Sequence, residues 1–148
     1  MDVHSWVHLA CHGGQNTKDR TKSAFFLYNG ELELEALMQR SLKNAELAIL
    51  SACQTATGDE MLPEEAVHLA AGMLTVGYQS VIATMWSIWD KDAPVLVKAL
   101  YSSLLGDHEG SFGRVDAAYA LHDAVKHLRD KIGEEEFERW VPFVHFGM

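Results

Sequence analysis

Cysteine and proline are scarce in this chain, which has two cysteines and three prolines among 148 residues. Two cysteines are too few for the disulfide framework of a small secreted domain, so we expect an intracellular, cytoplasmic protein in a reducing compartment. Hydrophobic residues make up 48% and charged residues 22% of the chain, which is typical of a folded domain rather than a disordered one. The length fits one domain with a single core.

Long apolar runs and an excess of positive charge are also lacking. No apolar stretch approaches the ~20 residues that a membrane-spanning helix needs, and the first residues do not pair a basic segment with an apolar one. The 12 basic and 21 acidic residues give a net charge of -9, which repels nucleic-acid backbones. We therefore expect neither a membrane nor a nucleic acid as a partner.

Patterns that hold cofactors or metals are missing as well. Gly13-Gly14 lacks the further glycines and the directly following helix of a dinucleotide-binding loop. No group of histidine, cysteine and carboxylate residues has zinc-site spacing, and a site made of Cys11, His12 and Cys53 would need Cys11 to point against the strand pleat. The sequence predicts a protein without a cofactor or a metal.

The chain does contain the alternating strand and helix patterns of an α/β fold. Three apolar runs predict buried strands near 5–11, 47–52 and 80–85, parallel and adjacent in that order. A shorter run at 25–28 is closed by the turn signal Asn29-Gly30, and a last short strand is expected at 143–146. Apolar spacing and end signals predict helices over 33–42, 63–76 and 111–132, and another that begins at Asp90 or Asp92 and ends before Gly106.

Two of these strands end in residues suited to nucleophilic catalysis. His12 follows the first strand and Cys53 follows the second, and the carboxyl ends of parallel strands meet at one edge of a sheet. Side chains alternate along a strand, so His12 shares a side with His8, and Cys53 shares a side with Ser51. This favours Cys53 as the partner of His12 and leaves Cys11 as a buried core thiol.

The chemistry of a thiol explains why these two residues would be paired. A thiol with a pKa near ~8.5 is mostly protonated at neutral pH, so it needs a base such as His12 to become a strong nucleophile. The backbone N–H groups of Gly13 and Cys53 are candidate donors to the oxyanion of a tetrahedral intermediate. On His12 and Cys53 alone, however, a core histidine and a core cysteine explain the pattern better than a dyad.

Longer stretches around these residues resemble a known family. They occur in the order and spacing of the CHAT domain, a caspase- and separase-like group of cysteine peptidases that is often found behind tetratricopeptide repeats. The variant most resembles the versions in fungal repeat proteins. The stretches that carry the resemblance are Ala10-Cys11-His12-Gly13, LSACQTATG at 50–58, EAVHLAAGML at 65–74, SVIATMW at 80–86 and WVPFVHFG at 140–147.

The resemblance implies a caspase-like α/β/α sandwich with a mostly parallel sheet, His12 as base, Cys53 as nucleophile, and oxyanion donors from Gly13 and Cys53. It also implies a peptide or protein substrate, and a tetratricopeptide-repeat region in cis or in trans as partner. CHAT domains usually carry strands and helices before the histidine strand, and this chain has none there. We therefore expect residues 1–148 to be the C-terminal portion of such a domain, with a bare edge on its first strand.

Substrate contacts are expected from the loops that follow the second and third buried strands. The candidates are Gln54 in the first loop and Trp89, Asp90 and Asp92 in the second. A carboxylate of Asp90 or Asp92 could hold a basic side chain that precedes the scissile bond. The alternative, which is favoured here, is that both aspartates cap the next helix.

Three functional classes follow from these residues. The first is a cysteine endopeptidase that acts through a thioester acyl-enzyme and is regulated by repeat or partner domains. The second is a catalytically inactive CHAT-fold interaction module in a signalling protein. A thiol-dependent hydrolase of small esters or amides has less support, because no small-molecule pocket is evident from the sequence.

Overall fold

A four-stranded sheet forms the centre of the computed structural model, which describes residues 4–14, 16, 19, 22–40, 42, 44–51, 63–106 and 116–147. Its strands are β1 (Trp6–Leu9), β5 (Leu47–Leu50), β6 (Ser80–Thr84) and β7 (Phe143–Gly147), in that spatial order. The first three are parallel and β7 is antiparallel to β6. The predicted order and direction of the three buried strands are confirmed, and β1 is paired with β5 alone among the described residues.

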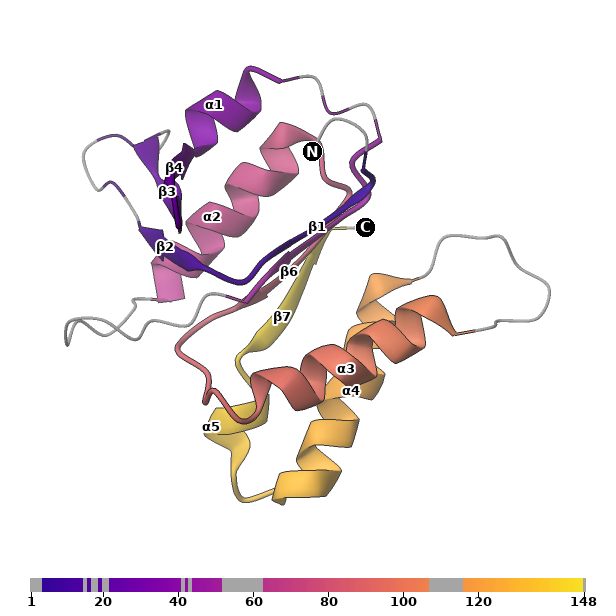
Figure 1. The fold of residues 1–148 in the computed structure, drawn as a ribbon. Helices are drawn as coiled ribbons and strands as arrows, with labels where there is room; N and C mark the ends of the chain where they lie inside the picture. The colour runs from indigo at the N-terminus through magenta and orange to yellow at the C-terminus, as the bar shows by residue number, and fades with distance from the viewer. Residues whose placement is uncertain are drawn as a thin grey trace.

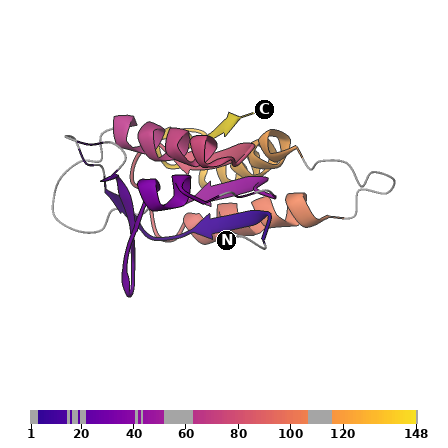
Figure 2. The same ribbon diagram turned by 90° about the horizontal axis from the view of Figure 1, so that it is seen from above.

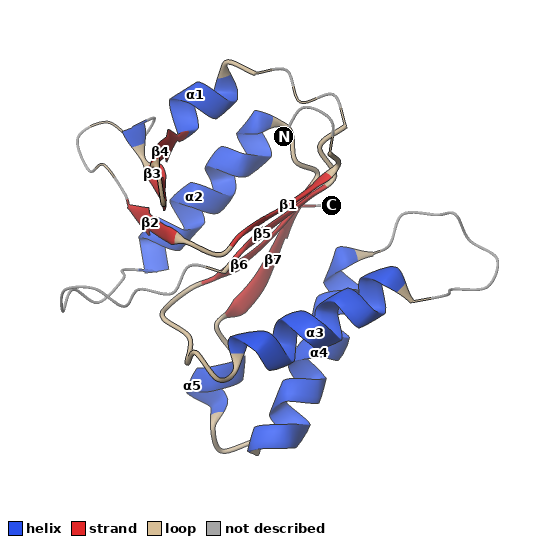
Figure 3. Ribbon diagram, viewed as in Figure 1, coloured by secondary structure: helices blue, strands red, loops and turns tan. Residues whose placement is uncertain are grey.

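Helices cover both faces of this sheet (Figure 1). One face carries α1 (Leu34–Met38) and α2 (Pro63–Val76), and the other carries α3 (Ala93–Leu105), α4 (Ala117–Ile132) and the short α5 (Phe137–Trp140). The strands are apolar on both sides because each side faces a separate core. The fold class is therefore confirmed as α/β, with helices on both faces of a mostly parallel sheet as in a caspase-like fold (Figure 3).

The two cores divide the residues of each strand by their alternation. Leu50 and Val81 pack towards α2, where Met73 is fully buried. Ile49 and Ile82 pack on the other side, against Leu100 of α3 and the side chains of α4. A polar side chain at the end of a strand therefore faces either the core beneath α2 or the core beneath α3 and α4, depending on its odd or even place along the strand.

A second, three-stranded antiparallel sheet lies beyond the end of β1 and next to α2 (Figure 1). It consists of β2 (His12–Gly14), β3 (Ala24–Leu27) and β4 (Gly30–Glu33). The Asn29-Gly30 turn is confirmed, and Gly30 has a φ of 148°, which a residue with a Cβ rarely adopts. The β3–β4 hairpin projects away from the main sheet (Figure 2), and Tyr28 at its tip is fully exposed.

Several element boundaries differ from those that the sequence predicts. The helix predicted over 33–42 begins at Leu34 and ends at Met38, and its buried residues are Leu34 and Leu37. Leu42 still packs against the same core, but from outside the helix. The helix predicted from 111 is described from Ala117, and residues 111–115 lie outside the described part of the chain.

Candidate active site

The carboxyl ends of β1 and β5 lie side by side at one rim of the main sheet. The two strands are paired in register as far as Leu9, which lies opposite Leu50. One residue further on, the backbone N–H of Ser51 donates to the carbonyl oxygen of Leu9 at 3.2 Å. β1 and β5 therefore end side by side, and His12 and Cys53 each follow three residues after the last residue of their strand.

His12 is the first residue of β2, and its side chain is exposed. It lies opposite Phe26 in the antiparallel sheet. Two residues, Ala10 and Cys11, connect it to the end of β1. An exposed imidazole just beyond the rim can meet a bound substrate. Cys53 and Gln54 lie outside the described residues, so the Cys-His dyad and the substrate contact of Gln54 stay predictions.

Gly13 is buried against α2, where an added side chain would force Leu69 to move. A Cβ at this position would lie 2.5 Å from Cδ1 of Leu69. At Gly14 a Cβ would lie 2.7 Å from Cε2 of Phe26. Close approach of α2 thus accounts for the small size of residue 13. The oxyanion role of its N–H stays a prediction.

Cys11 has the surroundings of a structural thiol. Its side chain is half-buried and packs against the core that contains Leu69 and Met73, on the α2 side of the sheet. Burial raises the pKa of the Cys11 thiol, which lowers its thiolate fraction at neutral pH. The thiol is less deeply buried than the sequence predicts, but its surroundings oppose rather than promote nucleophilic attack.

A chain of three polar side chains crosses the rim on the opposite face of the sheet. Nε2 of His8 lies 2.8 Å from Oγ of Ser51, and Nδ1 of His8 lies 3.2 Å from the hydroxyl of Tyr101 on α3. All three residues are half-buried. Burial lowers the pKa of His8 and raises the pKa of Tyr101, so both side chains are held in their neutral forms at pH 7.

Sequence reasoning placed His8 and Ser51 by strand parity but gave them no role, and it missed Tyr101. The available signal was the presence of polar residues in strands that are otherwise apolar. It could have indicated that His8 and Ser51 face each other across two adjacent parallel strands. Nothing local marks Tyr101, because it lies about 50 residues beyond Ser51 and meets His8 only through the fold.

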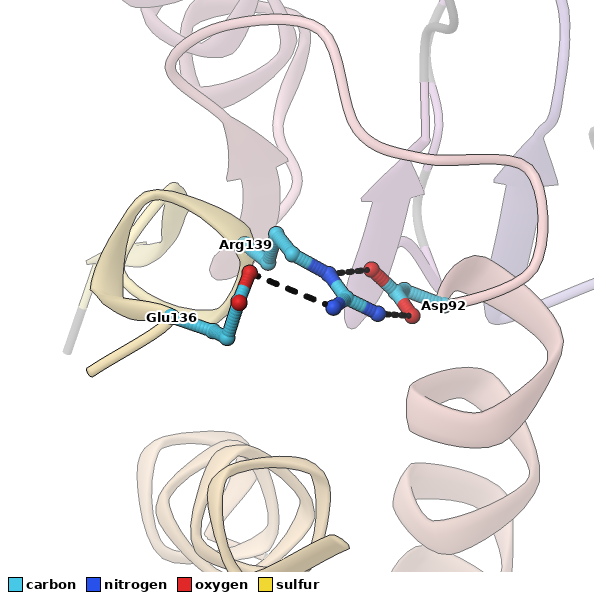
Figure 4. A network of polar contacts seen from close by, with 3 residues as sticks. All are labelled: Asp92, Glu136 and Arg139. Carbon is cyan, nitrogen blue, oxygen red and sulfur yellow. Dashed lines mark hydrogen bonds and ion pairs between the residues drawn. The ribbon is translucent and has the colours of Figure 1, made fainter. Parts of the chain in front are cut away.

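The loop between β6 and α3 carries the other predicted substrate contacts. Trp89 is 56% exposed, and Asp90 is exposed beside it. Asp92 is different, because its side chain is 3% exposed and both of its oxygens accept hydrogen bonds from Arg139 (Figure 4). The Nε–Oδ2 and Nη2–Oδ1 distances are both 2.7 Å.

This pairing corrects the prediction that Asp92 caps a helix. Asp92 does occupy the N-cap position of α3, but its side chain makes no capping hydrogen bond. A bidentate pair with a guanidinium is charge-assisted, and it turns the carboxylate of Asp92 towards Arg139 rather than towards the helix N–H groups. The hydrogen bonds to Asp92 raise the pKa of Arg139 further above its usual range. A basic substrate side chain at Asp92 would have to displace Arg139.

Residues near the C-terminus hold this loop in place. The Arg139 guanidinium lies 5.0 Å from the ring centroid of Trp89, and Nζ of Lys91 lies 4.6 Å from it. Nε1 of Trp86 donates to the carbonyl oxygen of Glu138 at 3.0 Å. The wall that the loop would offer to a substrate is therefore built against α5, and sequence reasoning did not find Arg139.

The described part of the chain holds neither a metal-ligand cluster nor a membrane-spanning helix. Its histidine, cysteine and carboxylate side chains form no group of three or more that could hold a metal ion. None of the helices in the same residues is long and apolar enough to cross a membrane.

Comparison with known proteins agrees with this architecture. The family model described as CHAT domain matches residues 4–148. A protein named Separin from Emericella nidulans is 28% identical over 116 residues, which cover 74% of this chain and 6% of the separin. The chain thus corresponds to a small part of that relative. The match over nearly the whole sequence shows that this chain belongs to the CHAT domain family, in the caspase- and separase-like group of peptidases.

Proposed function

We propose that this chain is a cysteine endopeptidase in which His12 is the general base and Cys53 the nucleophile. One observation carries the proposal: β1 and β5 are adjacent and parallel and end together at one rim. His12 is exposed just beyond the first strand, and Cys53 follows two residues after Ser51, which is bonded to β1. Membership of the CHAT family, which matches residues 4–148, supports this assignment.

The reaction needs two proton transfers in each half. His12 takes the proton of the Cys53 thiol, and the sulfur attacks the carbonyl carbon of the scissile peptide bond. The carbonyl electrons move to the oxygen, which accepts hydrogen bonds from the N–H groups of Gly13 and Cys53. The C–N bond then breaks, and the leaving amine takes the proton from His12. In the second half His12 deprotonates a water molecule, which attacks the thioester, and the released thiolate is protonated again.

Substrate selection is assigned to the loop between β6 and α3. Asp90 is proposed to meet a basic side chain that precedes the scissile bond, with Trp89 and Gln54 beside it. This choice is supported by the pairing of Asp92 with Arg139, which uses both Asp92 oxygens inside the chain. Regulation by a tetratricopeptide-repeat region, in cis or in trans, is part of the proposal, because the family is often found behind such repeats.

A thiol-directed peptide probe tests the catalytic assignment. The probe is a short peptide that ends in arginine carrying an electrophilic ketone, and its labelling rate is measured on the purified chain. Wild type and Cys11→Ala should be labelled, Cys53→Ala should not, and His12→Ala should react roughly 10²- to 10⁴-fold more slowly. A matched probe ending in glutamate should label more slowly than the arginine probe.

Two outcomes would contradict the proposal. Labelling that is lost in Cys11→Ala and kept in Cys53→Ala would show that the reactive thiol is Cys11 and not Cys53. A folded wild-type chain that neither takes the label nor cleaves a peptide would favour the alternative function, an inactive CHAT-fold interaction module in a signalling protein.

A further inference from the structure

We propose that Tyr101, His8 and Ser51 form a positioning chain that holds the end of β5 against β1 and thereby sets the reactivity of Cys53. The inference rests on the proposed function, because it gives these three side chains a role in presenting Cys53 to His12. None of the three is proposed to touch the substrate, so they are positioning residues.

The location of the chain suits this role. Ser51 is the last described residue before Cys53, and His8 precedes His12 by four residues on the neighbouring strand. Oγ of Ser51 lies 2.8 Å from Nε2 of His8. The contact therefore joins the two strands at the point where both leave the sheet towards the proposed catalytic residues.

Two different bonds attach Ser51 to β1. Its backbone N–H donates to the carbonyl oxygen of Leu9 at 3.2 Å, and its hydroxyl meets His8. The backbone bond fixes the spacing of the strands, but rotation about that single bond could still turn the following segment. The side-chain bond adds a second attachment point on the same face, so it fixes the direction in which the chain leaves β5.

Tyr101 fixes the imidazole in turn. A neutral imidazole donates from one ring nitrogen and accepts at the other, whereas serine and tyrosine hydroxyls can do either. The hydrogen bonds therefore run from Tyr101 through His8 to Ser51, or in the opposite direction. In both cases the 3.2 Å contact with Tyr101 on α3 occupies the second ring nitrogen of His8, so the ring is held at both ends.

A purely stabilising role would be filled better by apolar residues. His8 lies opposite Ile49, which belongs with Ile82 to the core beneath α3 and α4. Replacing a hydrogen-bonded polar pair in such a place by apolar groups of the same shape is often neutral or stabilising. The polar chain is thus better explained by the geometry that it imposes than by the stability that it adds.

Alkylation of Cys53 measures this geometry directly. The variants Tyr101→Phe, Ser51→Ala and His8→Gln are made in a Cys11→Ala background, where Cys53 is the sole thiol because the chain has two cysteines. The rate of reaction with iodoacetamide is followed against pH. If the positioning chain holds Cys53 near His12, each variant should shift the pH profile of the alkylation rate to higher pH. The reaction at pH 7 should then be slower by about tenfold, because less thiolate is present.

Trp6→Phe is the matched control. It removes another side-chain hydrogen bond of β1, from Nε1 of Trp6 to Oε2 of Glu46 at 3.2 Å, at the opposite end of the strand. It should leave the alkylation profile as in the parent, even if it lowers stability. Ser51→Thr keeps a hydroxyl and should restore most of the rate that Ser51→Ala loses, which a loss of packing alone would not explain.

The possible outcomes separate this inference from the proposed function. If Tyr101→Phe and Ser51→Ala react with the pH profile of Trp6→Phe, the positioning chain is disproved. If His12→Ala leaves the alkylation of Cys53 unchanged, the catalytic dyad is disproved. The comparison of Tyr101→Phe with Trp6→Phe still decides whether the positioning chain acts on Cys53. Should His8→Gln fail to fold, Tyr101→Phe provides the same test, because it removes one hydroxyl and keeps the ring.

Discussion

At the scale of single residues, Gly30 and Gly147 have similar backbone conformations and very different surroundings. Their φ angles are 148° and 124°, a region that residues with a Cβ rarely adopt. A Cβ at Gly30 would meet no atom within 4 Å. At Gly147 it would overlap the carbonyl oxygen of Gln79 and lie 3.1 Å from Cα of Ser80, both of which are backbone atoms. The pair therefore separates conformational strain from steric exclusion.

We predict that Gly147→Ala destabilises the chain more than Gly30→Ala. Strain alone should lower the free energy of unfolding by about 1–3 kcal/mol in Gly30→Ala. Gly147→Ala adds a clash that costs about another 1–3 kcal/mol, because the backbone of β6 cannot move aside without loss of the β6–β7 pairing. Urea unfolding of the two variants measures both values. Equal losses would show that the end of β7 does not pack against Gln79 as described.

At the scale of elements, the loop between β6 and α3 depends on α5 for its shape. Arg139 of α5 pairs with Asp92, which is buried, and with Glu136, whose side chain is 51% exposed. A buried carboxylate that loses its partner is destabilising, whereas an exposed ion pair contributes little. The two contacts of one arginine are thus expected to differ greatly in importance.

We predict that Arg139→Gln destabilises the chain and loosens the loop, and that Glu136→Gln does neither. In Arg139→Gln the Asp92 carboxylate stays buried without its bidentate partner, and Trp89 loses one of its two cationic neighbours. The backbone amides of residues 86–92 should then exchange with deuterium faster than in the wild type. The double variant Asp92→Asn/Arg139→Gln should recover part of the loss, because the unpaired charge is gone. Similar exchange in all three variants would refute the bracing role of α5.

Elements with strong periodic signals were predicted correctly, and those that depend on distant contacts were not. The apolar runs of β1, β5 and β6 gave the order and direction of the sheet, and Pro63 and Gly77 marked the two ends of α2. β2 is three residues long and carries two glycines, so it has no strand pattern of its own. It is a strand because β3 pairs with it.

The candidate site shows the same division. The place of His12 just beyond the rim agrees with the end of the first apolar run, which is a local signal. Asp92 was expected to cap a helix, because the residue type and position suit that role. Its actual partner, Arg139, lies 47 residues further along the chain and meets it only through the fold. Tyr101 escaped prediction for the same reason.

At the scale of the whole molecule, one sheet separates two cores, and the polar groups of its strands face the core beneath α3 and α4. His8 on β1 and His145 on β7 lie at opposite edges of that sheet, both half-buried. Burial lowers the pKa of each, and for His145 the carboxylate of Asp116 opposes part of the change. Nε2 of His145 is buried without a hydrogen-bond partner among the described residues. Protonation of either histidine is therefore expected to lower the free energy of unfolding.

We predict that the chain loses stability as the pH falls from about 7.5 to about 5.5. Above the ordinary histidine pKa of 6.5, His8 and His145 are neutral in both the folded and the unfolded chain and impose no pH dependence. Below it, the unfolded chain takes up protons that the folded chain resists, so the free energy of unfolding decreases until the pH passes below the lowered folded pKa values. Urea unfolding across this range should show a smaller decrease in His145→Gln than in the wild type. An unchanged decrease in that variant would mean that the burial of His145 does not contribute, because glutamine keeps the polar side chain and removes only the titration.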